Sequence, residues 1–180
     1  MSEFGDFLAH PADLAVKTGT PATDPRLLLA LQRAGDRFEG KISYKINLVT
    51  DDVVLLSGDG SRHLFLPARP VVGTPTVKIA GTPTTAFEVA RNNSILRHAT
   101  GWPDGLDNIE VTFSHGWEIP PADIQDAVLE QAETIFLVTV GIQSRTAGSE
   151  SITTSALAAI GVTQKWTDAV EKYALYGGDT

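Results

Sequence analysis

The sequence predicts an α+β protein in which an all-β region lies between helices. The strongest signal is a change of period within one stretch of the chain. Ile109, Val111 and Phe113 alternate with polar residues, which is typical of a strand with one buried face. From Ile124 onward the apolar residues recur at helical spacing. A second observation is that residues 41–116 hold short apolar runs separated by Gly, Pro or Asn, which is typical of an antiparallel β region.

The first long helix is predicted to begin at Pro25 and to end near Gly40. Thr23 or Asp24 supplies the N-cap, and proline is favoured at the first helical position. The residues at helical spacing are Leu27, Leu28, Leu31, Ala34 and Phe38. We interpret this segment as a helix that packs in a core.

The β region is predicted to begin with a strand over residues 42–48, because Ile42, Tyr44, Ile46 and Leu48 alternate with polar residues. A second strand is expected from Val53 to Leu56. Residues 50–52 and 57–61 are rich in Asp, Gly and Ser and are predicted to be turns. Several further short strands lead to the strand at residues 109–113.

The helix that follows Pro120–Pro121 is predicted to have two apolar faces. One face holds Ile124, Val128, Ala132 and Ile135, and the flanking face holds Leu129, Phe136 and Val140. Such a helix is either the central helix of its domain or a helix that also packs on a neighbouring subunit.

The end of the chain is predicted to hold an extended segment and one more helix. Residues 142–160 are rich in Ser and Thr, with Ile152 and Leu157 as the apolar anchors. Thr163 is a suitable N-cap for a last helix that carries Trp166 and Tyr173 on one face, and Gly177–Gly178 is predicted to end it.

Composition excludes several classes of function. The chain has 180 residues, no cysteine and a net charge of −8, so thiolate chemistry and cysteine-based metal sites are ruled out. An acidic chain is poorly suited to binding nucleic acid, because it repels the phosphates. The same repulsion would let DNA pass along a surface of the protein without binding to it. No apolar run is long enough to span a membrane and no signal peptide is evident, so we expect a protein with no membrane association.

No catalytic or metal-binding motif stands out. The four histidines are far apart in the sequence, and the acidic groups at Asp51, Asp52 and Asp59 fit turns. We therefore predict no catalytic residue, no cofactor and no metal. The alternative is a ligand-binding or hydrolytic β domain in which His63, His98 or His115 would meet Asp59 in one pocket.

Several motifs resemble one protein family. The stretches concerned are Leu27–Phe38, Leu64–Val72, Val77–Pro83, Trp102–Gly105, Ile109–Trp117, Ile119–Ile124 and Gly148–Ile152. Together they are similar to the head–tail connector (head-to-tail adaptor) proteins of long-tailed bacteriophages, over about residues 24–176. The chain departs from the family where Tyr173 is followed by Ala174, since a basic residue is common at that place in the family.

The resemblance implies a fold and a function. The fold would be an antiparallel helical bundle, formed by residues 1–40 and 117–180, with an all-β domain at residues 41–116 inserted between the second helix and the long central helix. The function would be structural and not enzymatic. A ring, typically of twelve subunits, would dock under the portal of the virion, extend the DNA channel and offer a platform for the stopper or tail. The ring would be assembled in the host cytoplasm, and the alternative position in the neck is that of a stopper or tail-completion protein.

Two sets of contact residues follow as predictions. For docking to the portal we expect the C-terminal residues Trp166, Tyr173, Leu175 and Tyr176. For contacts between subunits we expect Leu129, Phe136, Val140, Ile152 and Leu157, because a ring requires two different side faces on each subunit and the second face of the long helix could supply one.

Overall fold

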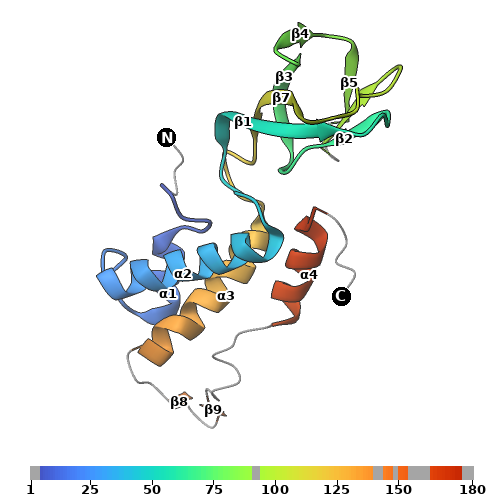
Figure 1. The fold of residues 1–180 in the computed structure, drawn as a ribbon. Coiled ribbons are helices and arrows are strands. Elements are labelled where there is room, and N and C mark those ends of the chain that lie inside the picture. The colour runs from blue at the N-terminus through green and yellow to red at the C-terminus, as the bar shows by residue number, and fades with distance from the viewer. Residues whose placement is uncertain (1–4, 91–93, 140–143, 148–149, 154–162, 176–180) are drawn as a thin grey trace. The chain divides into compact units, whose positions relative to one another are not determined.

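The computed structural model describes residues 5–90, 94–139, 144–147, 150–153 and 163–175, and it confirms the α+β class. The chain divides into two compact units (Figure 1). One consists of residues 1–43 and 119–180 and contains the helices, and the other consists of residues 44–118 and contains strands β1 to β7. Among the residues described, no helix has the length and apolar character needed to cross a membrane.

The helical unit begins with α1 (Pro11–Thr18) and α2 (Pro25–Ile42). Asp24 caps α2 as predicted, and its Oδ1 accepts a hydrogen bond from the Arg26 amide at 2.8 Å. The helix ends at Ser43, whose φ of 67° is left-handed. It therefore runs two residues past the expected end at Gly40 and includes Ile42, which is buried on the same apolar face as Phe38.

The central helix of this unit is α3 (Ala122–Thr139). The carbonyl of Pro121 accepts hydrogen bonds from the amides of Ile124 and Gln125, both at 3.0 Å, so the helix starts directly after the two prolines. Helices α1, α2 and α4 (Gln164–Tyr173) all pack against α3. Three helical neighbours explain why α3 is apolar on more than one face.

Helix α4 begins as predicted at Thr163, whose Oγ1 accepts a hydrogen bond from the Trp166 amide at 3.2 Å. It ends at Tyr173, four residues before the predicted end at Gly177, which lies outside the described residues. Between α3 and α4, β8 (Ser144–Ala147) and β9 (Glu150–Thr153) pair as an antiparallel hairpin.

The described part of the β unit holds seven strands in two sheets. The strands are β1 (Val49–Gly58), β2 (His63–Phe65), β3 (Val71–Ile79), β4 (Thr82–Thr84), β5 (Phe87–Ala90), β6 (Ile95–His98) and β7 (Gly105–His115). One sheet has the order β1-β7-β3-β4 and the other the order β2-β6-β5, with every neighbouring pair antiparallel. The chain crosses between the two sheets from β1 to β2, from β2 to β3, from β4 to β5 and from β6 to β7.

The core of the β unit is formed by alternate residues of its strands. In β7, Ile109, Val111 and Phe113 are buried, as the alternation in the sequence predicted. Trp102 is 1% exposed, and its indole N–H donates to the Leu96 carbonyl at 3.2 Å. Further large buried side chains are Leu64, Leu66, Val77 and Leu96.

The first and last segments of the β unit are hydrogen-bonded to each other. The Leu48 amide donates to the carbonyl of Trp117 at 2.9 Å, and the Trp117 amide donates to the carbonyl of Ile46 at 2.8 Å. This contact is an isolated parallel bridge centred on Asn47 and Trp117, so the strand predicted over residues 42–48 is wrong. Tyr44 and Ile46 are buried nonetheless, which explains the alternating pattern without a strand.

Candidate interaction surfaces

A polar cluster joins α4 to the start of α3. The carboxylate of Asp123 accepts hydrogen bonds from Lys172 Nζ at 2.6 Å and from the Tyr173 hydroxyl at 3.0 and 3.2 Å. Partial burial pushes the pKa of Asp123 upward, but the hydrogen bonds from Lys172 and Tyr173 outweigh it and leave the pKa below its usual value. The cluster therefore holds a charged Asp123 at neutral pH.

Apolar packing completes the contact of α4 with the other helices. The ring of Trp166 packs edge-on against Phe38 of α2, with the ring centroids 5.2 Å apart. Lys165 precedes Trp166 in the chain, and its Nζ lies 2.6 Å from Glu130 Oε1 of α3. Helix α4 is thus held by this aromatic contact together with the ion pairs of Lys165 and Lys172.

The predicted portal-docking residues lie mostly in this packed interface. Trp166 is 4% exposed and Tyr173 is 8% exposed, so both side chains are used within the helical unit. Leu175 is half-buried, and Tyr176 lies outside the described residues.

The predicted subunit contacts show a similar distribution. Leu129 and Phe136 are buried within a single chain, where the neighbouring helices cover the second face of α3. Val140 and Leu157 lie outside the described residues, and Ile152 belongs to β9, whose side chains are not described. The two apolar faces of α3 were explained either by a central position in its domain or by packing on a neighbouring subunit. Because three helices of the same chain pack on α3, the structure supports the central position.

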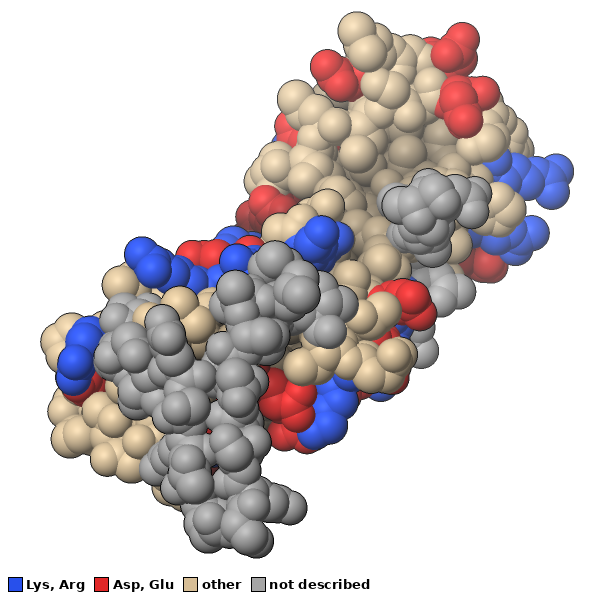
Figure 2. Space-filling view, turned by 90° about the horizontal axis from the view of Figure 1, so that it is seen from below, with Lys and Arg blue, Asp and Glu red and all other residues tan. Residues whose placement is uncertain are grey.

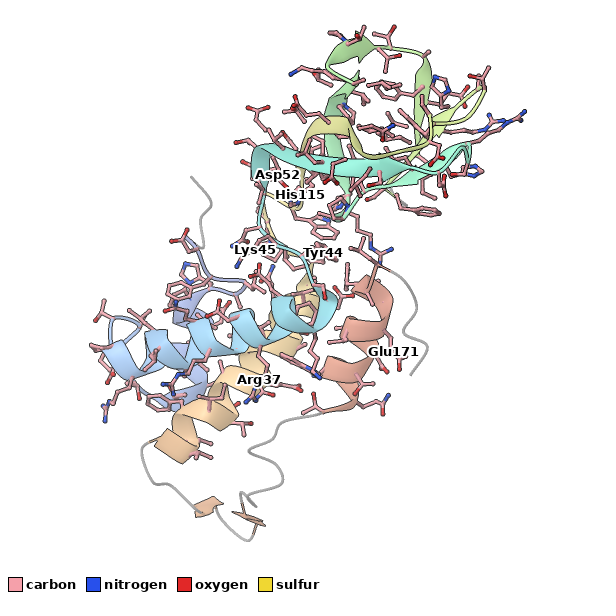
Figure 3. All side chains as sticks on the ribbon, viewed as in Figure 1. Arg37, Tyr44, Lys45, Asp52, His115 and Glu171 are labelled. Atoms are coloured by element: carbon pink, nitrogen blue, oxygen red, sulfur yellow. The ribbon has the colours of Figure 1, made fainter. Side chains whose placement is uncertain are left out.

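His115 forms a histidine–carboxylate pair with Asp52. Its Nε2 lies 3.3 Å from Asp52 Oδ2, and Figure 3 shows the two side chains together where β7 ends and β1 begins. The imidazole is buried, and its Nδ1 has no hydrogen-bond partner among the residues described. Burial lowers the pKa of His115, while the hydrogen bond and charge of Asp52 act in the opposite direction. The side chain is therefore neutral at pH 7.

The residues named for a hydrolytic or ligand-binding site do not meet in the surface hollow beside β5 and β6. That hollow is lined by Thr85, Ala86, Phe87, Glu88, Arg97 and Ala99. Asp59 accepts a hydrogen bond from the Ser61 amide at 2.9 Å. This bond is typical of the turn predicted at residues 57–61. Within the described part of the chain, no group of three or more His, Asp or Glu side chains could hold a metal ion.

An exposed apolar pair on β1 forms a surface that is not among the predicted contact residues. Val53 is 58% exposed and Leu55 is 59% exposed, whereas Val54 and Leu56 point to the other side of the strand. The sequence already indicated this surface, because residues 53–56 are four consecutive apolar residues. A strand with one solvated face ordinarily alternates apolar and polar residues, so such a run indicates that both faces are covered.

Comparison with known proteins gives several similar solved chains, among them two from particle necks. No protein-family model matches the chain, and no curated protein matches it. A chain from a structure described as the neck of an empty GTA particle, computed with C6 symmetry, is 21% identical, with 87% of each chain covered and a TM-score of 0.48. A chain from the neck of a native GTA particle, computed with C12 symmetry, is 18% identical, covering 87% of this chain and 89% of that one, with a TM-score of 0.45. Identities and TM-scores this low do not show a shared family.

Proposed function

We propose that this protein is a structural protein of a phage neck, a head-to-tail adaptor that forms a ring under the portal. The observation that carries the proposal is the order of the elements. The β unit lies between α2 and α3, and its two ends are hydrogen-bonded to each other at Ile46, Leu48 and Trp117. A β domain inserted into an antiparallel helical bundle is what the resemblance to connector proteins implies, and this order supports it.

In this role the protein extends the DNA channel and provides the platform for the stopper or tail, and it is not an enzyme. Its net charge of −8 suits a channel through which DNA must pass without binding. Figure 2 shows acidic and basic side chains interspersed over the described parts of the face in view. The proposed site of action is the virion, at the head–tail interface.

We assign portal docking to the C-terminal residues, with a division of roles. Trp166 and Tyr173 hold α4 on the helical unit, so they could reach a portal only if α4 left its present site. Docking in the present arrangement is therefore assigned to Leu175 and Tyr176. Leu129, Phe136, Val140, Ile152 and Leu157 remain the proposed subunit contacts, with Leu129 and Phe136 dependent on a rearrangement of the helices that bury them.

The docking assignment is tested by truncating the chain after Ala174. This change keeps α4 and its contacts with Phe38 and Asp123, so the free energy of unfolding should stay the same. Portal attachment, measured by co-sedimentation, should be lost. Attachment at the wild-type level would refute the assignment of docking to residues 175–180.

The adaptor function itself is tested by measuring mass with light scattering, for the chain alone and for the chain mixed with its cognate portal. The expected result is a ring on the portal, visible by negative-stain electron microscopy. No association with the portal at any salt concentration would contradict the proposal. The stopper or tail-completion position would then be tested by adding the chain to necks that already contain an adaptor.

A further inference from the structure

The outer face of the sheet around β1 has an unusual composition. Val53 pairs with Thr112 of β7, which pairs in turn with Thr76 of β3. Leu55 pairs with Glu110, which pairs with Lys78. Because paired residues lie on the same side of a sheet, these side chains form one surface, opposite the face that buries Val111 and Val77. We call this surface the β1 face.

The β1 face is apolar or uncharged except for one ion pair. Lys78 Nζ donates to Glu110 Oε1, so the two charges on the face neutralise each other. Further along β3, Val72 is 42% exposed and pairs with Ser114. The exposed Asp51 borders the far end of this face, where its amide donates to Ser114 Oγ at 3.1 Å. The area around Val53 and Leu55 carries no charge other than the ion pair, on a chain whose net charge is −8.

Only the middle of β1 lacks the usual protection of an edge strand. β1 is the end strand of its sheet, and Asp51, Asp52 and register shifts protect its two ends. Residues 53–56 between them contain neither a charged residue nor a proline. The strand at the opposite edge, β4, is only three residues long and has Pro83 at its centre, which blocks pairing with another chain. The exposed apolar residues Val53 and Leu55 in the unprotected middle of β1 indicate that this part of the strand is covered in the working protein.

We propose that the β1 face is a contact between neighbouring copies of this chain, an inference that rests on the proposed ring-forming function. The net charge of the chain indicates which partner covers the β1 face. Two acidic chains repel each other, so they approach most closely where the surface is neutral. Nucleic acid would need free Lys or Arg, and Lys78 is already paired with Glu110. Because a ring uses head-to-tail contacts, the β1 face meets a different surface of the next copy.

The first test uses Leu55→Glu and Leu55→Lys, with Val16→Glu and Val16→Lys as matched controls. Val16 is 85% exposed and lies on α1, in the helical unit. Self-association is measured by sedimentation, with and without the portal, and folding by thermal unfolding. Both Leu55 variants should fold normally and should weaken self-association at least about tenfold, because either charge must lose its water in the contact. The Val16 variants should stay within about twofold of the wild type.

The outcomes separate this inference from the adaptor function. Rings formed by both Leu55 variants as readily as by the wild type would overturn the inference and leave the adaptor function standing. Stronger association of Leu55→Lys than of the wild type would also overturn it, because charge repulsion alone would then control assembly. A wild-type chain that binds neither itself nor the portal would overturn both.

A second test identifies the occupant directly. The chain has no cysteine, so Leu55→Cys gives a single site for a photoactivated cross-linker. The chain carrying the cross-linker is mixed with isotope-labelled wild-type chain in the presence of portal. Cross-links from position 55 to the isotope-labelled chain are expected. Cross-links found only to the portal, or only within one chain, would overturn the inference.

Discussion

At Gly116 a positive φ and a close approach of the backbone together exclude a side chain. Its φ is +93°, and a Cβ atom there would lie 2.5 Å from the carbonyl oxygen of Asn47 and 2.7 Å from that of Ile46. We expect Gly116→Ala to lower the free energy of unfolding by at least about 2 kcal/mol, from backbone strain and this close approach.

Gly40→Ala is the control for this prediction. Gly40 lies within α2, and a Cβ atom there meets nothing within 4 Å. Alanine should raise the free energy of unfolding by about 0.5–1 kcal/mol, since glycine is a poor helix former. Urea denaturation measures both variants. Similar effects from the two substitutions would contradict the role given to Gly116.

His115 should make the stability of the β unit depend on pH. Burial lowers its pKa in the folded chain, so the unfolded chain binds more protons in the acidic range. The stabilisation is complete above the unfolded pKa of about 6.5 and is lost as the pH falls toward the folded value. Denaturation between about pH 7.5 and 5 should show falling stability, with a slope of up to about 1.4 kcal/mol per pH unit.

Two variants test the origin of that slope. His115→Gln cannot titrate and should reduce it. Asp52→Asn removes the carboxylate that raises the pKa of His115 against the lowering by burial. The pKa of His115 should then fall further, so the loss of stability on acidification should continue to lower pH. An unchanged pH profile in both variants would exclude His115 as its source.

At the scale of the elements, the polar cluster at Asp123 should help to hold α4 in place. Asp123→Asn removes the charge that binds Lys172 and should cost up to about 1 kcal/mol at neutral pH, since both side chains are partly exposed. Because the pKa of Asp123 is lowered in the folded chain, its contribution is present above about pH 4 and is lost as the pH falls further.

Asp13→Asn is the matched control, because it removes the same charge from the first turn of α1 at an exposed position. Hydrogen exchange of the α4 amides is the measurement. Asp123→Asn should speed that exchange, whereas Asp13→Asn should leave it near the wild-type rate. Equal acceleration would show that only the loss of one negative charge matters, wherever it lies.

At the scale of the whole molecule, the β unit should fold by itself. It is one continuous segment, residues 44–118, with its own core around Trp102. Its ends are already tied by the hydrogen bonds between Trp117 and residues 46 and 48. A fragment of residues 44–118 should therefore give a dispersed amide NMR spectrum and a cooperative thermal transition. A spectrum typical of an unfolded chain would show that the unit needs the helices to fold.

The sequence by itself determined the elements whose signals are local. The N-caps at Asp24 and Thr163, the start of α3 after Pro121 and the buried alternation in β7 were all predictable, because each depends on neighbouring residues. The strand predicted at residues 42–48 was wrong because alternation reports burial and not hydrogen bonding. Ile42 extends α2, and Tyr44 and Ile46 are buried in an irregular segment that meets Trp117.

Only the tertiary structure decided which apolar side chains remain exposed. Leu129, Phe136, Trp166 and Tyr173 are apolar or aromatic residues on helices, and periodicity cannot tell whether a helix of the same chain or a partner covers them. The structure buries all four within one chain. It leaves Val53 and Leu55 exposed instead, because they lie on the outer face of the sheet, and which face of a sheet becomes buried depends on contacts between residues distant in the sequence.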